Sequence, residues 1–599
     1  MVFSSERSGI RIGQEVDLIT YEVVRSSLTN LVDVMGRRLR RVAFSPVITE
    51  GCDYTLAVCD AEGDVVACGS RDLPAHLGTL EFTVRAVLAK YDLEDIRDGD
   101  FYFLNDPHAA GSHNNDVRVL APFYFDASLV GWVVSCGHWT DVGGPFPGSF
   151  NPDARSCFAE GLRIPATRLV RGGVVAAEVV DLVLGNLRTP SQARGDLQAQ
   201  IEACRAGLEG LRHLCERYGA SVVETCFAQM MMQSEHLFLE QAAARLAMGT
   251  FEFSDCVDED SAVEGSGPIW VRLKLTVARD HLTFDFRGSD PAPTGPSGNP
   301  LPMTWSAVIC ATLNFLPGVP FNHGIIRCIS VLVDTPSCVS VAFPGPVCAT
   351  GSGVYMKAEA CALNCLGQAD PANATGCTYN LQNLTIGGRR QDGSEWVMYL
   401  WTVGGFGGSA RGDGGIPSMM LFAAGTKTQP VEVLERTNPI LFERVAIAPD
   451  SMGAGKFCGG PAEERVFVVR NGEATLTAIG DRFRHPIWGV CGGGPGKRQE
   501  IVVDFGSSNE RCVGVSVSGI NIRPGCRVYL RSGGGGGFGV PLERAAEMVL
   551  RDIERGWVTK EAAEASFGVV LREDPSASVG VAVDQAGTVA LRRNLAKGV

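Results

Sequence analysis

The chain has 599 residues, which predicts several structural units at about 100–200 residues per domain. Apolar residues make up 45% of the chain and charged residues 20%, as in ordinary soluble globular proteins. The net charge is −14 and no basic tract occurs, so neither nucleic acid nor an anionic membrane is an expected partner. No apolar stretch reaches about 18 uncharged residues and the N-terminus lacks the apolar core of a signal peptide, so we expect a cytoplasmic protein without a transmembrane helix.

The first 150 residues mix helices and strands. Helical spacing of apolar residues predicts a helix over 14–42 that ends in a basic turn, and a second one follows over 74–91. YTLAVCD, AEGD and VVACG predict a hairpin over 54–68. Strands are predicted for FYFLNDP, VRVLAPFYF and LVGWVVSCG. Proline and glycine interrupt the segment that begins at residue 105, so we expect no regular helix or strand in its first part.

The rest of the chain changes pattern several times. It is helical over 192–247, strand-rich over 250–290, mixed over 301–430 and strand-rich over 440–530, with two C-terminal helices over 541–556 and 559–571. We therefore predict a mixed α/β (α+β), multi-domain protein, with mixed sheets and flanking helices. The predicted units are a metal-site domain (1–190), a helical segment (191–249), a middle domain (250–430) and a glycine-rich β region with C-terminal helices (431–599). The 20 cysteines contain no C-x-x-C pair, so we expect reduced, mostly buried thiols.

Imidazoles and carboxylates gather in three short segments beside predicted strands. NDPHAAGSHNNDVRVL (105–120) places His113 three residues before Asp116, and GHWTDVGG (137–144) places His138 three residues before Asp141. ITEGCDYTL adds Glu50 and Asp53. Two imidazoles with carboxylates suit Zn²⁺, Mn²⁺ or Fe²⁺, whereas Ca²⁺ and Mg²⁺ need only oxygen ligands. Spacing alone leaves open a second interpretation, in which Asp and Asn cap turns and the histidines are incidental.

Two glycine-rich segments invite a phosphate-loop interpretation. CGGGPGKRQ (491–499) has Cys491 and Arg498 where a Walker A loop needs glycine and Ser or Thr, so we reject an ATP site there. The run Gly533–Gly537 could wrap a ligand with its backbone amides, or it could be a flexible turn before the helix at 541, which we favour.

Taken together, these motifs resemble the hydantoinase B/oxoprolinase family. The resemblance runs nearly end to end and is carried by the following segments: FSPVITEGCDYTLAVCDAEGDVVA, LPAHLGTL, NDPHAAGSHNNDVRVLAPFY, GHWTDVGGPFPGSF, NLRTPSQARGDLQAQ, PIWGVCGGGPG and SGGGGGFGVPLERAAEMVLRDIERG. Any one of these matches would be weak, but so many in the same order are specific.

The resemblance implies an enzyme subunit with a divalent metal (Zn, Mn or Fe). Its expected partner, in a hetero-oligomer, is a hydantoinase A-like subunit that binds ATP and Mg and phosphorylates a small-molecule substrate. Carried over residue by residue, the metal ligands are Glu50, His113, Asp116 and His138. The candidates for proton transfer or ligand orientation are Asp53, Asp106 and Asp141. Trp139 stands where the family often has histidine, so we do not expect it to be a ligand. His76 and His108 stay open, with a structural role favoured for His76.

Three functions follow from the resemblance. The first is metal-assisted hydrolysis of a cyclic amide (a hydantoin, oxoproline or a lactam) that the partner has activated with ATP. The second is ATP-dependent carboxylation of a ketone such as acetone or acetophenone. The third is a non-catalytic binding role with a structural metal. The ligands would be the same in each case, so the sequence does not separate them.

Overall fold

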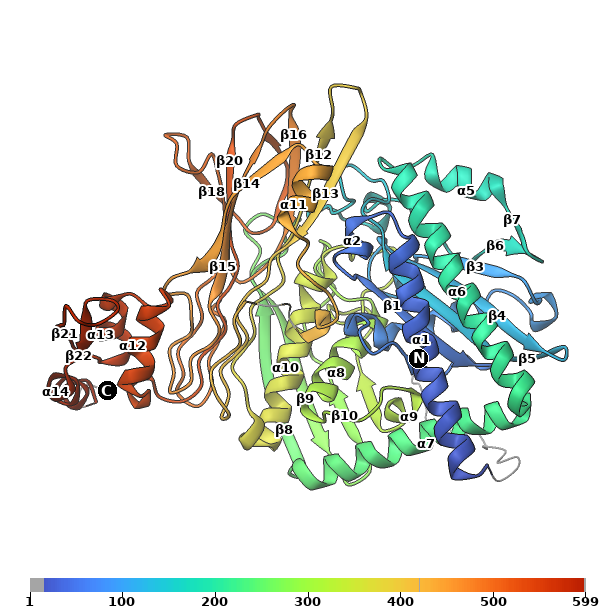
Figure 1. The fold of residues 1–599 in the computed structure, drawn as a ribbon, viewed down its shortest axis with the longest axis horizontal. Helices are drawn as coiled ribbons and strands as arrows, with labels where there is room; N and C mark the ends of the chain where they lie inside the picture. The colour runs from blue at the N-terminus through green and yellow to red at the C-terminus, as the bar shows by residue number, and fades with distance from the viewer. Residues whose placement is uncertain (1–15, 418, 420, 597–599) are drawn as a thin grey trace.

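The computed structural model describes residues 16–417, 419 and 421–596, and it has the predicted mixed α/β architecture (Figure 1). Its N-terminal part is an antiparallel sheet of seven strands in the order β2-β1-β5-β4-β3-β6-β7. The strands are β1 (Tyr54–Asp60), β2 (Val65–Cys68), β3 (Phe101–Leu104), β4 (Asp116–Phe125), β5 (Ser128–His138), β6 (Thr167–Arg171) and β7 (Val174–Val175). The predicted hairpin over 54–68 and the three predicted strands are confirmed.

Two long helices cover one face of this sheet. They are α1 (Leu18–Val42) and α6 (Pro190–Tyr218), which pack on each other in front of the strands (Figure 1). The side chain of Asp17 accepts hydrogen bonds from the first amides of α1, and Arg40 and Arg41 lie in its last turn, where cations are favoured. Alternate residues of β4, such as Val117 and Val119, point into this layer, whereas Leu120 points to the opposite face.

The opposite face of the sheet packs on a second α/β layer. This layer contains α8 (Leu301–Phe315), α10 (Val354–Ala369) and a four-stranded sheet in the order β11-β10-β9-β8. Its strands are β8 (Gly249–Val257), β9 (Ile269–Val277), β10 (Leu282–Asp285) and β11 (Ile329–Leu332), and only the β10–β11 pair is parallel. The helix α7 (Ala220–Arg245) leads from α6 into this layer. Polar side chains on this face of the first sheet are therefore enclosed between two layers.

Two further sheets enclose a smaller core. One has the order β13-β12-β16-β19 and the other β14-β15-β20-β17-β18. Their strands are β12 (Asn383–Arg389), β13 (Glu395–Trp401), β14 (Ile440–Ala448), β15 (Ala462–Val469), β16 (Ala474–Ile479), β17 (Glu500–Val503), β18 (Arg511–Gly514), β19 (Val517–Ile522) and β20 (Arg527–Arg531). The strand-rich pattern predicted over 440–530 is confirmed.

The C-terminal end is a small helical body at the left of Figure 1. It holds α12 (Ala546–Glu554), α13 (Lys560–Phe567) and α14 (Gln585–Leu595), with β21 (Leu571–Glu573) and β22 (Val581–Val583). The predicted second helix over 559–571 is too long, because Gly568 takes a left-handed conformation at its C-cap and β21 follows. α14 was not predicted from the sequence.

The segment after residue 105 also differs from the prediction, because it contains one helical turn, α4 (Pro107–Ala110). Proline is tolerated at the first position of a helix, where its missing N–H has no intrahelical partner. Asp106 caps this turn by accepting a hydrogen bond from the His108 N–H.

No helix in the described part of the chain is long and apolar enough to cross a bilayer. The cysteines are free and mostly buried, as predicted, with Cys491 and Cys512 exposed.

The run Gly533–Gly537 is not the exposed, flexible turn that the sequence favours. It is buried and extended, and it lies among other glycine-rich segments. Gly535 donates to the carbonyl of Gly460 at 2.9 Å and accepts from the N–H of Gly453 at 2.9 Å, and Gly408 donates to Gly536 at 2.8 Å. Glycine is needed here because a Cβ atom would meet the backbone of the neighbouring segment.

Replacing Gly535 with alanine should therefore destabilise the protein. The added Cβ would contact the backbone carbonyl of Phe406, which cannot move aside as a side chain does. We expect a loss of about 1–3 kcal/mol in the free energy of unfolding, measured by denaturant titration. Gly267→Ala is the matched control, because its Cβ would meet nothing within 4 Å. Equal stability of the two variants would contradict this account of the glycine-rich segments.

Candidate metal centre

The pairing of three neighbouring strands brings the candidate ligands together. In the β4–β5 ladder Asp116 lies directly opposite His138, and opposite residues of an antiparallel pair point to the same face. On the other side of β5, Asp53 immediately precedes β1 and its carbonyl accepts a hydrogen bond from the His138 N–H at 3.2 Å. Asp53, His138 and Asp116 thus form one row across the ends of β1, β5 and β4.

His113 completes the group from the loop before β4. Its Nε2 lies 3.3 Å from Oδ2 of Asp116, and Nδ1 of His138 lies 3.4 Å from Oδ1 of the same carboxylate. One potential ligand atom from each of these three residues lies within 4.8 Å of the others. Asp53 adjoins this group through His138: its Oδ2 lies 3.7 Å from Nδ1 of that imidazole.

Amide side chains hold the two ligand-bearing loops together. Asn115 donates through Nδ2 to the carbonyl oxygens of Trp139 at 2.9 Å and Gly148 at 3.2 Å, and Asn105 donates to the carbonyl of Asn114 at 2.6 Å. Trp139 turns to the other face of the sheet, where its indole N–H donates to Gln200 of α6 at 3.0 Å. It is therefore not placed to act as a ligand.

His76 also contacts the central carboxylate. It lies in a 3₁₀ helix, η1 (Pro74–Thr79), with Nε2 3.3 Å from Oδ2 of Asp116. The Thr55 hydroxyl donates to the carbonyl of Leu73 at 2.9 Å, so the His76 Nδ1–H, 3.2 Å away, is the donor to that hydroxyl. Burial opposes charge on this imidazole, but Cys136 and Asp116 raise its pKa well above the ordinary value. His76, Asp116 and Cys136 also each offer one potential ligand atom within 4.8 Å of the others, so His76 is placed either to orient Asp116 or to share a metal with it.

The protonation states suit a metal-binding set. Burial lowers the pKa of His113 to about 4, which keeps its imidazole neutral at neutral pH. Burial alone would raise the pKa of Asp116, but the neighbouring imidazoles of His113, His76 and His138 hold it well below the ordinary value. Neutral imidazole and ionised carboxylate are the forms that bind divalent metals.

Four buried polar atoms of this group have no hydrogen-bond partner among the residues that the structure describes. They are Oδ1 of Asp53, Nδ1 of His113, Oδ1 of Asp116 and Nε2 of His138. Buried polar atoms are normally paired, so four unpaired ones in a single cluster fit a site that binds something further. The residues present therefore fit a divalent metal of the His₂–carboxylate type.

A small cavity of about 60 Å³ adjoins the cluster. Its remaining wall is largely apolar and includes Met303, Leu381, Trp401 and Phe422. The ring of Tyr399, from β13, stacks on His138 with centroids 4.6 Å apart and an interplanar angle of 6°. No Lys or Arg lies among the described residues that line this cavity.

Three other predicted residues lie outside this group. Glu50 ends the short helix α2 (Pro46–Thr49), and no group of three potential ligands within the described residues includes it. Asp106 caps α4 and pairs with Arg163 at 2.8 Å; burial opposes the charge, but bonds from His108 and Arg163 lower its pKa to about 2. The buried carboxylate of Asp141 accepts hydrogen bonds from Arg188 and from the N–H groups of Gly143 and Gly148.

A separate group, away from this centre and not singled out from the sequence, contains Asp64, Glu81 and His323. Nδ1 of His323 lies 2.7 Å from Glu81 and Nε2 lies 3.2 Å from Asp64, while Arg85 pairs with both carboxylates. Since these charges neutralise one another, this group is an ion-pair network that ties distant segments together.

The fold and this cluster define a protein with a candidate metal site buried between two α/β layers. The family model for hydantoinase B/oxoprolinase matches residues 17–541, and the chain belongs to this family.

Individual relatives agree with this assignment. The chain is 30% identical to the beta subunit of caprolactamase from Pseudomonas jessenii, over 93% of this chain and 96% of the relative. It is 28% identical to the B component of a putative D-/L-hydantoinase from Pseudomonas sp. (strain NS671), over 94% and 96%. Among solved structures, the ATP-dependent caprolactamase from Pseudomonas jessenii superposes with a TM-score of 0.89 at 26% identity, over 97% of this chain and 100% of that one. Nucleotide-free acetone carboxylase shares the fold, with a TM-score of 0.90 at 18% identity, over 97% and 83%.

The placement of Asp141 yields a prediction. Asp141→Ala should lower the free energy of unfolding by about 1–3 kcal/mol, because the N–H groups of Gly143 and Gly148 and the Arg188 side chain lose their acceptor. Arg188 is partly exposed, so water limits the loss. The metal content of this variant should not change. Asp181→Ala is the control, since Asp181 also pairs with an arginine at 2.9 Å but on the surface, and its stability should change by less than about 0.5 kcal/mol. Loss of metal from Asp141→Ala at unchanged stability would contradict this role.

Proposed function

We propose that this chain is the B-type subunit of an ATP-dependent cyclic-amide hydrolase and carries a catalytic divalent metal. The observation that supports this most directly is the group His113, Asp116 and His138, with unpaired buried atoms beside a small, mostly apolar cavity. Relatives named as caprolactamase and hydantoinase subunits favour cyclic amides as the substrate class.

His113, Asp116 and His138 would hold the metal, with Asp53 beside them. A metal bound there would polarise a carbonyl oxygen or lower the pKa of a bound water to about 7. His76 orients the Asp116 carboxylate, and Tyr399 fixes the plane of the His138 imidazole by stacking on it. The apolar wall excludes bulk water, which strengthens the electrostatic interactions of the site.

Asp53 is the best-placed proton acceptor among the three carboxylates predicted for that role. Its Oδ1 is buried, has no partner and belongs to a residue that lines the cavity. The carboxylates of Asp106 and Asp141 are already engaged by arginines and backbone N–H groups. We therefore assign proton transfer to Asp53 and local structural roles to Asp106 and Asp141.

An A-type partner would supply the ATP-dependent activation in a hetero-oligomer. The amide carbonyl is a poor electrophile because nitrogen resonance stabilises it, so phosphorylation of its oxygen in the partner would prepare it for attack here. The absence of a Walker A pattern from the sequence and the naming of two relatives as subunits support this division of labour.

Ketone carboxylation is the second candidate, favoured by the close fold similarity to acetone carboxylase. The same residues would hold the metal in both reactions, so a comparison of substrates with and without bicarbonate separates them. A binding role with a purely structural metal is the third candidate, and a cavity that reaches the ligands argues against it.

Metal analysis of the purified chain is the first test. We expect about one Zn, Mn or Fe per chain, lost in His113→Ala and retained in His108→Ala. The control removes an imidazole from the same loop, but His108 lies outside the cluster and contacts the carbonyl of Gly345 at 3.0 Å. Equal metal content in all three proteins would refute the site.

Glu50, the predicted fourth ligand, can be tested by the same metal analysis, and Asp53, the proposed proton acceptor, by an activity assay. Glu50→Gln should keep the metal, because Glu50 lies outside the cluster, whereas Asp53→Asn should abolish turnover when ATP, the A-type partner and a cyclic amide are supplied. Metal loss from Glu50→Gln would restore Glu50 as a ligand. Full activity of Asp53→Asn would remove Asp53 from the mechanism.

A further inference from the structure

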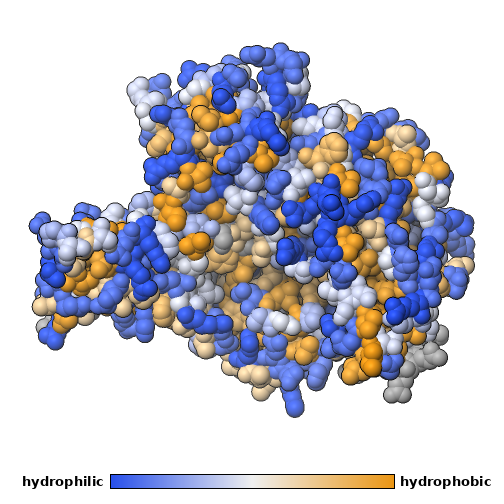
Figure 2. Space-filling view, in the orientation of Figure 1, coloured by the Kyte–Doolittle hydropathy of each residue, from blue (hydrophilic) through white to orange (hydrophobic). Residues whose placement is uncertain are grey.

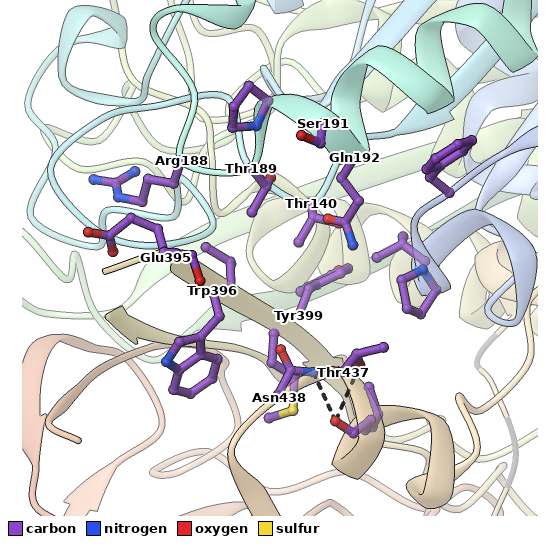
Figure 3. A pocket seen from close by; sticks show the side chains of 18 of the residues that line it. Thr140, Arg188, Thr189, Ser191, Gln192, Glu395, Trp396, Tyr399, Thr437 and Asn438 are labelled. Carbon is purple, nitrogen blue, oxygen red and sulfur yellow. Dashed lines mark hydrogen bonds between the residues drawn. The ribbon is translucent and has the colours of Figure 1, made fainter. Parts of the chain in front are cut away.

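A second, larger cavity of about 530 Å³ lies beside the metal centre and plays no part in the function proposed so far (Figure 3). The N-terminal end of α6 and Thr140 form one side, and residues of β13 and α11 (Val431–Thr437) form the other. Tyr399 lines both this outer cavity and the metal cavity. We propose that the outer cavity binds a phosphoryl group.

The beginning of α6 is suited to an anion. This helix has 29 residues, begins with Pro190 and has no side chain capping its first turn. Its first intrahelical bond runs from the Ala193 N–H to the Thr189 carbonyl, so the N–H groups of Ser191 and Gln192 precede the helical ladder. Both residues line the cavity, and free amides at a helix N-terminus favour negative charge.

A buried hydroxyl is the independent sign that the cavity takes a ligand. Thr140 is 5% exposed, lines the outer cavity and has no hydrogen-bond partner for Oγ1. In Figure 3 its side chain lies beside Gln192, whose buried Oε1 also has no partner. The Thr140 hydroxyl can donate to a phosphoryl oxygen. The Gln192 side chain can also donate to it through its NH₂ group, if the amide is rotated by about 180°.

Two arginines give the cavity a cationic wall. Arg390 donates only to neutral oxygens, namely the carbonyls of Glu395 at 2.9 Å and Thr437 at 2.8 Å and the hydroxyl of Ser394 at 3.4 Å. Within the described part of the chain, no carboxylate lies within 4.0 Å of its guanidinium. Arg188 also lines the cavity, although Asp141 already offsets its charge.

One carboxylate opposes this charge. Glu395 lines the cavity, but its Oε1 is 3.0 Å from Nε of Arg389, which offsets the negative charge. Asp392, which does not line the cavity, also interacts with the charge of Arg390. Arg390 and the α6 N-terminus therefore leave the lining itself net positive, in a protein whose overall charge is −14.

The position beside the metal centre suggests the source of the phosphoryl group. Because Tyr399 lines both cavities and stacks on His138, a phosphate ester bound in the outer cavity would lie close to the metal centre. The ligand would be the phosphorylated substrate or the released inorganic phosphate. This identification of the source rests on the proposed function, whereas the anion site itself does not.

Calorimetric titration of inorganic phosphate into chelator-treated protein tests the site without the metal. We expect saturable binding that weakens at least about tenfold in Arg390→Gln and in Thr140→Val, since each loses a charge-assisted hydrogen bond. Thr140→Val should keep or raise the melting temperature, because the hydroxyl that it removes has no partner in the protein. Arg436→Gln is the control: it removes the same charge from an exposed position of α11 outside the cavity, so binding should change by less than about twofold.

A phosphate monoester such as phenyl phosphate distinguishes the sources. Tighter binding of the ester than of phosphate would identify the activated substrate as the ligand, and tighter binding of phosphate would identify the product; both support a phosphoryl site. No saturable binding of either ligand up to about 10 mM, or equal weakening in Arg390→Gln and Arg436→Gln, would overturn the proposal. Metal content is measured separately, so either outcome leaves the test of the metal centre intact.

Discussion

The register of β4 on β5, and of β5 on β1, is the constraint on which the candidate site depends. Because Asp116 lies opposite His138 and Asp53 adjoins His138 across β1, three polar side chains share one face at the ends of the strands. A slip of one residue in either ladder would turn a ligand toward α1 and α6. The alternating apolar residues of β4, buried against those helices, stabilise this register.

The site also depends on segments far away in the chain. Tyr399 comes from β13, Leu381 lies just before β12 of the same sheet, and Met303 comes from α8 of the second α/β layer, so the cavity exists only where these parts meet the first sheet. The glycine-rich segments join the later sheets in the same way. Figure 2 shows the face of the molecule seen there as a mixture of polar and apolar side chains. The missing side chains of the glycines let backbones approach closely enough for hydrogen bonds between segments distant in sequence. The site therefore depends both on the register of neighbouring strands and on packing between segments distant in sequence.

The sequence predicts most of the elements and the core of the site, for identifiable reasons. Period-two and period-3.6 patterns indicate the strands and long helices, whereas His113, Asp116 and His138 are named by the family resemblance, because H-x-x-D spacing alone left turn-capping residues and incidental histidines as an alternative. The resemblance names Glu50 as a ligand and Asp53 as a candidate for proton transfer, but only the β1–β5 pairing shows that Asp53 is the carboxylate that approaches His138. The contact of His76 with Asp116 is also a tertiary contact between segments forty residues apart, which no local pattern reports. Five consecutive glycines suggest flexibility when read alone, yet neighbouring glycine-rich segments bury them.

The separation of charge between the two cavities is a physical reason for having both. Asp53 and Asp116 line the inner cavity, where a bound divalent metal would offset their charges, whereas Arg390 and the N-terminus of α6 attract a phosphoryl dianion in the outer one. Holding the anion outside would keep its negative charge away from Asp53 and Asp116 and direct the uncharged ring toward the apolar wall. An activated amide needs this division, because its leaving oxygen is strongly anionic while its carbon skeleton is not. The shared Tyr399 is the boundary at which the two environments meet.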